Sequence, residues 1–137
     1  MKLLAFDYGL KRTGLAETDD LQIIASALET VETKNLFTYI NSYLEKNKVE
    51  AFVVGEPKRL NNERTHSSDA VDQFVKNLNS TYPNIPVHLV DERFTSKMAF
   101  QTMISSGISK KKRREKGTVD RISATLILQS YMESKSF

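Results

Sequence analysis

Hydrophobic residues in the first part of the chain fall into short groups that polar turns separate. Residues 3–6 are a short apolar run without helical spacing, which indicates a buried strand that stops at Asp7. Two more extended segments follow at 13–18 and 21–30, and the pair Asp19-Asp20 between them is a turn signal. Together the three segments predict an antiparallel meander.

The rest of the chain alternates between helical and extended spacing. Leu36, Ile40 and Tyr43 recur at intervals of four and three, which predicts a helix with one apolar face. A meander followed by alternating helices and strands predicts one α/β domain over residues 1–137, with a mixed sheet and flanking helices. The predicted elements after the meander are helices at 33–48, 68–79, 95–106 and 118–133 and strands at 51–54 and 87–90, with loops at 58–68 and 107–117.

Composition narrows the possible chemistry. The chain has 137 residues, no Cys and two His, so disulfides, zinc–thiolate sites and Cys nucleophiles are excluded. The apolar run in the start MKLLAF is too short for a signal peptide, because polar residues follow it immediately. No apolar run approaches the roughly 20 residues of a membrane helix. We therefore expect a cytoplasmic protein without a membrane partner.

Positive charge is concentrated in one segment. The net charge of +3 is too small to identify a partner by itself. A compact run of cations attracts polyanions, although most charge runs are solvated surface. Because the run lies just before Asp120, we expect it to contact nucleic acid. Its members are Lys110, Lys111, Lys112, Arg113, Arg114 and Lys116.

Three acidic positions stand at the ends of predicted elements. Asp7 closes the first strand, Glu92 follows the last strand together with Asp91, and Asp120 lies near the start of the final helix. Sites in open α/β sheets gather beyond the carboxyl ends of strands. If the first and last strands are parallel neighbours, Asp7 and Glu92 emerge at the same edge. A helix packed across the sheet could then bring Asp120 to them.

Clustered carboxylates of this kind favour a hard metal ion. They repel one another unless a cation neutralises them, and oxygen ligands suit Mg²⁺ or Mn²⁺. Two such ions about 4 Å apart can activate a water and stabilise the leaving oxygen in phosphodiester cleavage. Taken singly, each acid also fits a structural role, because Asp is common in turns and in the first turn of helices. Spacing alone therefore does not establish the site.

Four segments that span nearly the whole chain carry a resemblance to a known family. They are FDYGLKRTGLA, VVGEP, VDERFTSKMA and KGTVDRISATLILQSYM, in this order. The combination resembles the YqgF/RuvX family of Holliday-junction-resolvase-like nucleases. The resemblance implies an RNase H-like fold with a five-stranded mixed sheet and helices on both faces. It puts Asp7, Glu92 and Asp120 on the family's acidic positions and implies processing of the 5′ end of the 16S ribosomal RNA precursor.

One position departs from the family pattern. The chain has Gly55-Glu56-Pro57 where the family usually has Gly-Leu-Pro. Glu56 closes a strand that is predicted to adjoin the first strand, which makes it a candidate for a fourth metal ligand. The alternative is a solvent-facing Glu on a loop, because Glu is mostly exposed in proteins. Whether Asp91 also binds metal stays open.

Cations and aromatic residues beside the acids complete the candidate site. Lys11 and Arg12 follow the first acid by four and five residues, and we expect at least one of them to contact a phosphate. Arg93 could contact phosphate, orient a carboxylate or form a structural ion pair. Tyr8 and Phe94 could stack on bases, although core packing also fits Phe94.

Two other functions are compatible with these residues. A Holliday junction resolvase would use the same metal chemistry on four-way DNA, and it should be dimeric because it makes two symmetric nicks. A nucleic-acid-binding module with little catalysis would bind no divalent metal. The sequence is compatible with a monomer or a homodimer.

Overall fold

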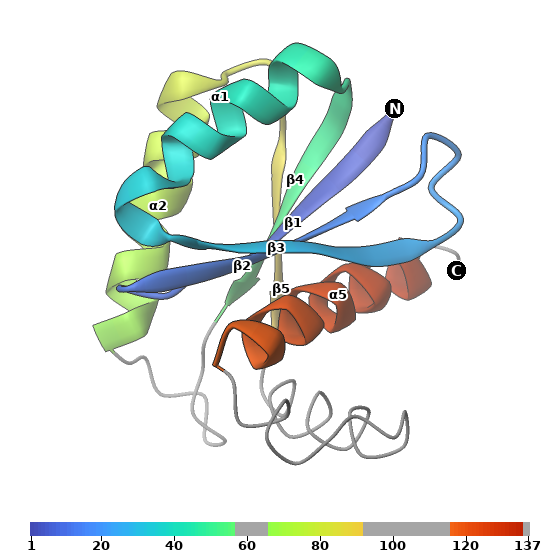
Figure 1. The fold of residues 1–137 in the computed structure, drawn as a ribbon. Helices are drawn as coiled ribbons and strands as arrows, with labels where there is room; N and C mark the ends of the chain where they lie inside the picture. Colours follow the sequence, from blue (N-terminus) through green and yellow to red (C-terminus); the bar gives the residue numbers. More distant parts are fainter. Residues whose placement is uncertain (57–65, 92–115, 136–137) are drawn as a thin grey trace.

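The computed structural model describes residues 1–56, 66–91 and 116–135 of the chain (Figure 1). The helix predicted at 95–106 and most of both predicted loops lie outside the described residues. The strands are β1 (Lys2–Asp7), β2 (Arg12–Thr18), β3 (Ala25–Glu32), β4 (Val49–Glu56) and β5 (Val87–Asp91). The helices are the short 3-10 helix η1 (Thr33–Asn35), α1 (Leu36–Lys46), α2 (His66–Thr81) and α5 (Lys116–Lys135).

The strands form one sheet in the order β3-β2-β1-β4-β5. β2 pairs antiparallel with β1 and with β3, whereas β4 pairs parallel with β1 and with β5. The predicted five-stranded mixed sheet is confirmed. However, β4 separates β1 from β5, so the supposition that the first and last strands are neighbours is wrong. Their ends are two strand spacings apart, which is about 10 Å.

Side chains that alternate between the two faces of the sheet define two cores. Leu4 and Phe6 of β1 pack with residues of α1 and α2, including Phe74. Leu3 and Ala5 point the opposite way and pack with residues of α5. Figure 1 shows the resulting layers, with α1 and α2 on one side of the sheet and α5 on the other. The predicted helices on both faces are therefore confirmed.

The connection between β2 and β3 differs from the predicted third strand. β3 begins four residues later than predicted, at Ala25. The Asp19 carboxylate accepts the backbone N–H groups of Ile23 at 2.7 Å and Ile24 at 2.8 Å. Gln22 adopts a φ of 56°. A carboxylate that bonds amides a few residues ahead stabilises a turn in place of a strand.

The helices differ from their predicted ranges by two or three residues at each end. α1 begins after η1 and ends at Lys46, where Asn47 adopts extended backbone angles. α2 begins at His66 and ends at Thr81, two residues beyond the predicted range at both ends.

Within the described ranges, no helix combines the length and the apolar character that crossing a membrane requires.

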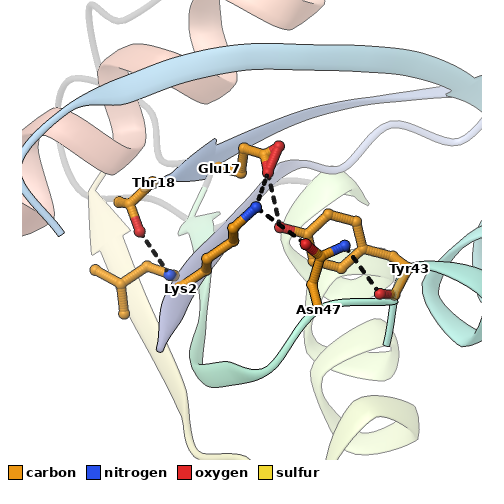
Figure 2. A network of polar contacts seen from close by, with 6 residues as sticks. Lys2, Glu17, Thr18, Tyr43 and Asn47 are labelled. Atoms are coloured by element: carbon orange, nitrogen blue, oxygen red, sulfur yellow. Dashed lines mark hydrogen bonds and ion pairs between the residues drawn. The ribbon is translucent and has the colours of Figure 1, made fainter. Parts of the chain in front are cut away.

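A polar network ties the amino end of the sheet to α1 (Figure 2). The Lys2 ammonium lies 3.1 Å from Glu17 Oε1 and donates to Asn47 Oδ1 at 3.0 Å. Tyr43 donates its hydroxyl proton to the same Glu17 oxygen at 3.0 Å. These groups join β1, β2 and the end of α1. They stabilise the end of the sheet that lies opposite Asp7.

Candidate active site

Asp7 is the last residue of β1 and pairs with Gly14 of β2. Leu3 and Ala5, at the alternate positions before it, pack with residues of α5. Because strand side chains alternate with a period of two, Asp7 belongs to the face of the sheet that α5 covers. Its side chain is half-buried. A carboxylate in this position is accessible to a cation or a substrate at the end of the strand.

The direction of α5 brings its first turns to the same end of the sheet as the first acid. Met132, late in α5, lines a hollow together with residues 22–25 of the β2–β3 connection. That connection lies at the amino end of β1, since the Met1 ammonium donates to the Asp20 carbonyl at 3.2 Å. Position 120 precedes Met132 by about 18 Å of helix, and β1 spans about 20 Å. Asp120 therefore lies on the part of α5 that passes the carboxyl end of β1.

Helical spacing puts position 120 in line with three buried residues of α5. Ser123, Ala124 and Ile127 follow it by three, four and seven residues, and all three are buried. α5 begins at Lys116, two residues earlier than predicted, and its first turn contains no acid. The structural role of an Asp in the first turn, which complements the helix dipole, therefore does not apply. Positions 7 and 120 share one face and one end of the sheet.

Glu56 and Asp91 lie at the same edge but belong to the opposite face. They pair with each other across β4 and β5. Val54 packs on the side of α1 and α2, and Glu56 follows it by one period of the strand. His88 contacts Tyr131 of α5, with ring centroids 5.1 Å apart, so Asp91, three residues later, falls on the other face. Both candidates for an additional metal ligand, Glu56 and Asp91, therefore belong to the sheet face that α2 covers.

The complete metal site stays a prediction. Glu92 follows Asp91 and lies outside the described residues, as does the side chain of Asp120. Among the described residues, no group of three His, Asp or Glu side chains is arranged to hold a metal ion. Lys116 is the first residue of α5. The other candidates outside the described residues are Arg93, Phe94, Lys110, Lys111, Lys112, Arg113 and Arg114.

Lys11 in the connection between β1 and β2 and Arg12 at the start of β2 are the two cations of which at least one was predicted to contact phosphate. Lys11 is exposed and Arg12 is half-buried. The turn requires a glycine at position 9, because a Cβ on Gly9 would collide with the carbonyl oxygen of Arg12. Gly14 lies two residues after Arg12 in β2 and pairs with Asp7. Arg12 therefore shares the sheet face of that acid.

Tyr8, the next residue after Asp7, stacks on Phe74 of α2. The ring centroids are 4.5 Å apart and the ring planes differ by 17°. Phe74 also contacts Phe6 and Phe37 in edge-on arrangements. Burial raises the pKa of Tyr8 above its ordinary value. One face of the Tyr8 ring is occupied by the core, so base stacking by this residue stays a prediction for its other face.

Thr33 contributes to the β1–β2 turn in a way that the sequence pattern did not indicate. Its hydroxyl donates to the Gly9 carbonyl at 2.5 Å, and its backbone N–H donates to the Lys11 carbonyl at 2.9 Å. The sequence predicted Thr33 as the start of a helix. Only the pairing of Arg12 with Glu32 across β2 and β3 brings Thr33 to this turn. No local signal could have revealed these bonds.

Solved structures of junction resolvases have the same fold. The fowlpox virus Holliday junction resolvase matches with a TM-score of 0.56 and 17% identity, covering 98% of this chain and 99% of the other. Thermus thermophilus RuvC in complex with a Holliday junction matches with a TM-score of 0.56 and 14% identity, covering 98% and 97%. The fold class of this protein is therefore RNase H-like.

The chain belongs to the RuvX family, described as Holliday junction resolvase, which matches residues 1–134. A relative from Flavobacterium johnsoniae is 51% identical over 136 residues, which is 99% of each chain. A relative from Phocaeicola vulgatus is 52% identical over 136 residues, and the matched region covers 99% of this chain and 98% of the relative. Both relatives carry the name "Putative pre-16S rRNA nuclease".

Proposed function

We propose that this protein is a metal-dependent nuclease that hydrolyses phosphodiester bonds of structured RNA and processes the 5′ end of the 16S ribosomal RNA precursor. The observation that carries the proposal is the arrangement of β1 and α5, which brings positions 7 and 120 to one face and one end of the sheet. The names of the relatives support the choice of substrate. Because bacteria make ribosomal RNA in the cytoplasm, the proposal requires a cytoplasmic protein.

In this proposal, Asp7, Glu92 and Asp120 hold Mg²⁺ or Mn²⁺ in a site for two ions. Carboxylate oxygens are the hard donors that these cations prefer, and the chain has no Cys and two His to offer in their place. A bound divalent ion supplies a water of lowered pKa and stabilises charge on the leaving oxygen. The position of Asp7 supports this role, because the residue ends β1 and is only half-buried.

The choice of Glu92 over its neighbours follows from the alternation of strand positions. Glu56 and Asp91 belong to the face opposite α5. A chain that continued the strand beyond Asp91 would put its next residue, Glu92, on the α5 face with Asp7. We therefore expect substitution of Glu92 to reduce cleavage much more than substitution of Glu56 or Asp91.

The cations serve to orient the substrate in the same proposal. Arg12 shares the sheet face of Asp7, so its guanidinium can bind a phosphate oxygen beside the scissile bond through charge-assisted hydrogen bonds. Lys11 adds a second positive charge in the adjoining turn. Further contacts with the nucleic-acid backbone come from Arg93 and the basic run, Lys110, Lys111, Lys112, Arg113, Arg114 and Lys116.

The test is cleavage of a precursor RNA that carries the 5′ leader of the 16S sequence, with Mg²⁺ or Mn²⁺ present. Asp7→Asn and Asp120→Asn should each abolish cleavage while leaving the circular dichroism spectrum unchanged. Asp20→Asn is the matched control, because Asp20 is an exposed acid at the opposite end of the sheet. If Asp7→Asn cleaves as fast as the parent protein, the proposed site is wrong.

Cleavage of four-way DNA is the second candidate function, and the description of the family favours it. The same metal chemistry cuts both polymers, so a synthetic four-way junction belongs in the same assay. A junction resolvase should sediment as a dimer, and a strictly monomeric protein would count against that role. If calorimetry detects no binding of Mn²⁺, the protein is instead a nucleic-acid-binding module.

A further inference from the structure

Thr33 locks the β1–β2 turn through a directed chain of hydrogen bonds. The Gly9 carbonyl can only accept, so the Thr33 hydroxyl proton points to it. The Thr13 hydroxyl lies 2.9 Å from the Thr33 hydroxyl and must therefore be the donor in that pair. Thr13 is fully buried. The chain runs from Thr13 through Thr33 to Gly9, and bonds in such a chain strengthen one another.

The locked turn borders a hollow of positive charge. The hollow has a volume of about 400 Å³ and is lined by Leu10, Lys11, Arg12, Glu32 and Lys34. Three cations and one acid give its lining a formal charge of +2. The volume exceeds that of a single phosphate and fits a sugar–phosphate segment of a nucleic acid.

Lys34 is held close to the turn, and its exposed ammonium can bind an anion. It follows Thr33, whose backbone N–H is bonded to the Lys11 carbonyl at 2.9 Å. Its ammonium lies 3.2 Å from Glu32, and the two side chains are 77% and 61% exposed. An ion pair this exposed contributes little stability, so a phosphate can replace Glu32 as the partner of Lys34 at small cost.

We propose that this hollow is a backbone-phosphate subsite for the nucleic acid, in which Lys34 acts with Lys11 and Arg12 and Thr33 is the positioning residue. The inference rests on the proposed nuclease function and extends the substrate path beyond the motif that contains Asp7. A nucleic-acid backbone fits better than a free anion, because several cations lie around one open hollow next to the catalytic strand end.

The first experiment measures how salt weakens binding of a labelled RNA hairpin with a 5′ single-stranded extension. Fluorescence anisotropy is recorded in EDTA, so that no cleavage occurs. Lys34→Ala should reduce the slope of log K against log salt by about 0.7 to 0.9, which is one phosphate contact. Between 50 and 200 mM salt, the parent should therefore lose about threefold more affinity than Lys34→Ala.

The matched control for this measurement is Lys46→Ala. Lys46 is an exposed cation in the last turn of α1, near the network that closes the amino end of the sheet. Its removal changes the net charge equally, and the slope should stay at the parent value. If Lys34→Ala and Lys46→Ala give equal slopes, or if the parent does not bind the RNA, the subsite is refuted.

The second experiment tests the positioning role of Thr33. Thr33→Val keeps the shape but removes the hydroxyl, whereas Thr33→Ser keeps the hydroxyl. In cleavage assays, Thr33→Val should raise KM with little change in kcat, and Thr33→Ser should restore the parent KM. If Thr33→Ser fails to restore KM, or if only kcat changes, Thr33 does not position the subsite.

The outcomes also separate this inference from the nuclease proposal. A parent protein that cleaves RNA, with Lys34→Ala equal to Lys46→Ala in binding, refutes the subsite and leaves the function standing. A parent that never cleaves, with a reduced slope for Lys34→Ala, refutes the function and leaves the subsite standing.

Discussion

Tyr43 at the amino end of the sheet offers a stability prediction whose magnitude changes with pH. The substitution is Tyr43→Phe, which removes one hydroxyl and keeps the ring. In the structure that hydroxyl donates to Glu17 Oε1 at 3.0 Å, in the network that also contains Lys2 (Figure 2). Tyr43 is 7% exposed. The hydrogen bond is therefore largely shielded from water, and its acceptor is charged.

The magnitude at pH 7 follows from the loss of this bond. A hydrogen bond to a charged group contributes about 1.5–3 kcal/mol. Glu17 keeps its ion pair with Lys2 and is half-buried, so water can replace part of the lost interaction. We expect Tyr43→Phe to lower the free energy of unfolding by about 1–2 kcal/mol at pH 7.

Alkaline pH should remove most of the difference in stability between the two proteins. Burial, and then the negative charge of Glu17, raise the pKa of Tyr43 far above its ordinary value. The hydroxyl must stay protonated in the folded state, whereas in the unfolded state it ionises near pH 10. Its contribution is therefore complete below pH 10 and is lost as pH rises toward the folded pKa. The loss at pH 11 is about 1.4 kcal/mol, which offsets most of the advantage of the parent protein.

The assay is urea unfolding of both proteins between pH 7 and pH 11, followed by circular dichroism. Tyr39, whose pKa burial and Glu29 raise to about 12, is present in both proteins. The difference between the two proteins therefore isolates Tyr43. A difference in unfolding free energy that stays constant from pH 7 to pH 11 would refute the reasoning.

Three further predictions concern the carboxyl end of the sheet. Phe74→Leu should lower the free energy of unfolding in urea by about 2–3 kcal/mol and Phe37→Leu by about 1 kcal/mol, because among the described residues Phe74 contacts three aromatic rings and Phe37 contacts one. Equal losses for the two variants would contradict this. Gly9→Ala should cost about 1–3 kcal/mol, since the new Cβ collides with the Arg12 carbonyl, and an unchanged melting temperature would contradict it. Mn²⁺ at a hundredfold excess over its Kd should stabilise the parent by about 2.7 kcal/mol, measured as a rise in Tm. Asp7→Asn should gain much less, and an equal gain would exclude Asp7 as a ligand.

Local sequence patterns were sufficient for the parts of the fold that depend on local physics. The apolar run at 3–6 forms β1 and ends at Asp7, because four consecutive buried residues need cover on both faces of the sheet. The spacing of Leu36, Ile40 and Tyr43 places them on the buried face of α1. The pattern failed at residues 21–24, where Leu21, Ile23 and Ile24 are exposed. Hydrophobicity suggested a strand there, but the Asp19 carboxylate bonds the backbone as a turn.

The candidate site shows what a one-dimensional pattern cannot contain. A period of two assigns each residue of a strand to a face, but it does not say which strands are neighbours. The acids were predicted from strand ends under the supposition that β1 adjoins β5, and β4 lies between them. That order puts Glu56, and not Glu92, on the strand next to Asp7, yet alternation turns Glu56 to the opposite face. Lying on the strand next to Asp7 and sharing the sheet face of Asp7 are therefore two criteria that select different acids. Because a metal ion needs donors that converge on one side of the sheet, the face is the stronger criterion, and it favours Asp120 on α5 as the partner of Asp7.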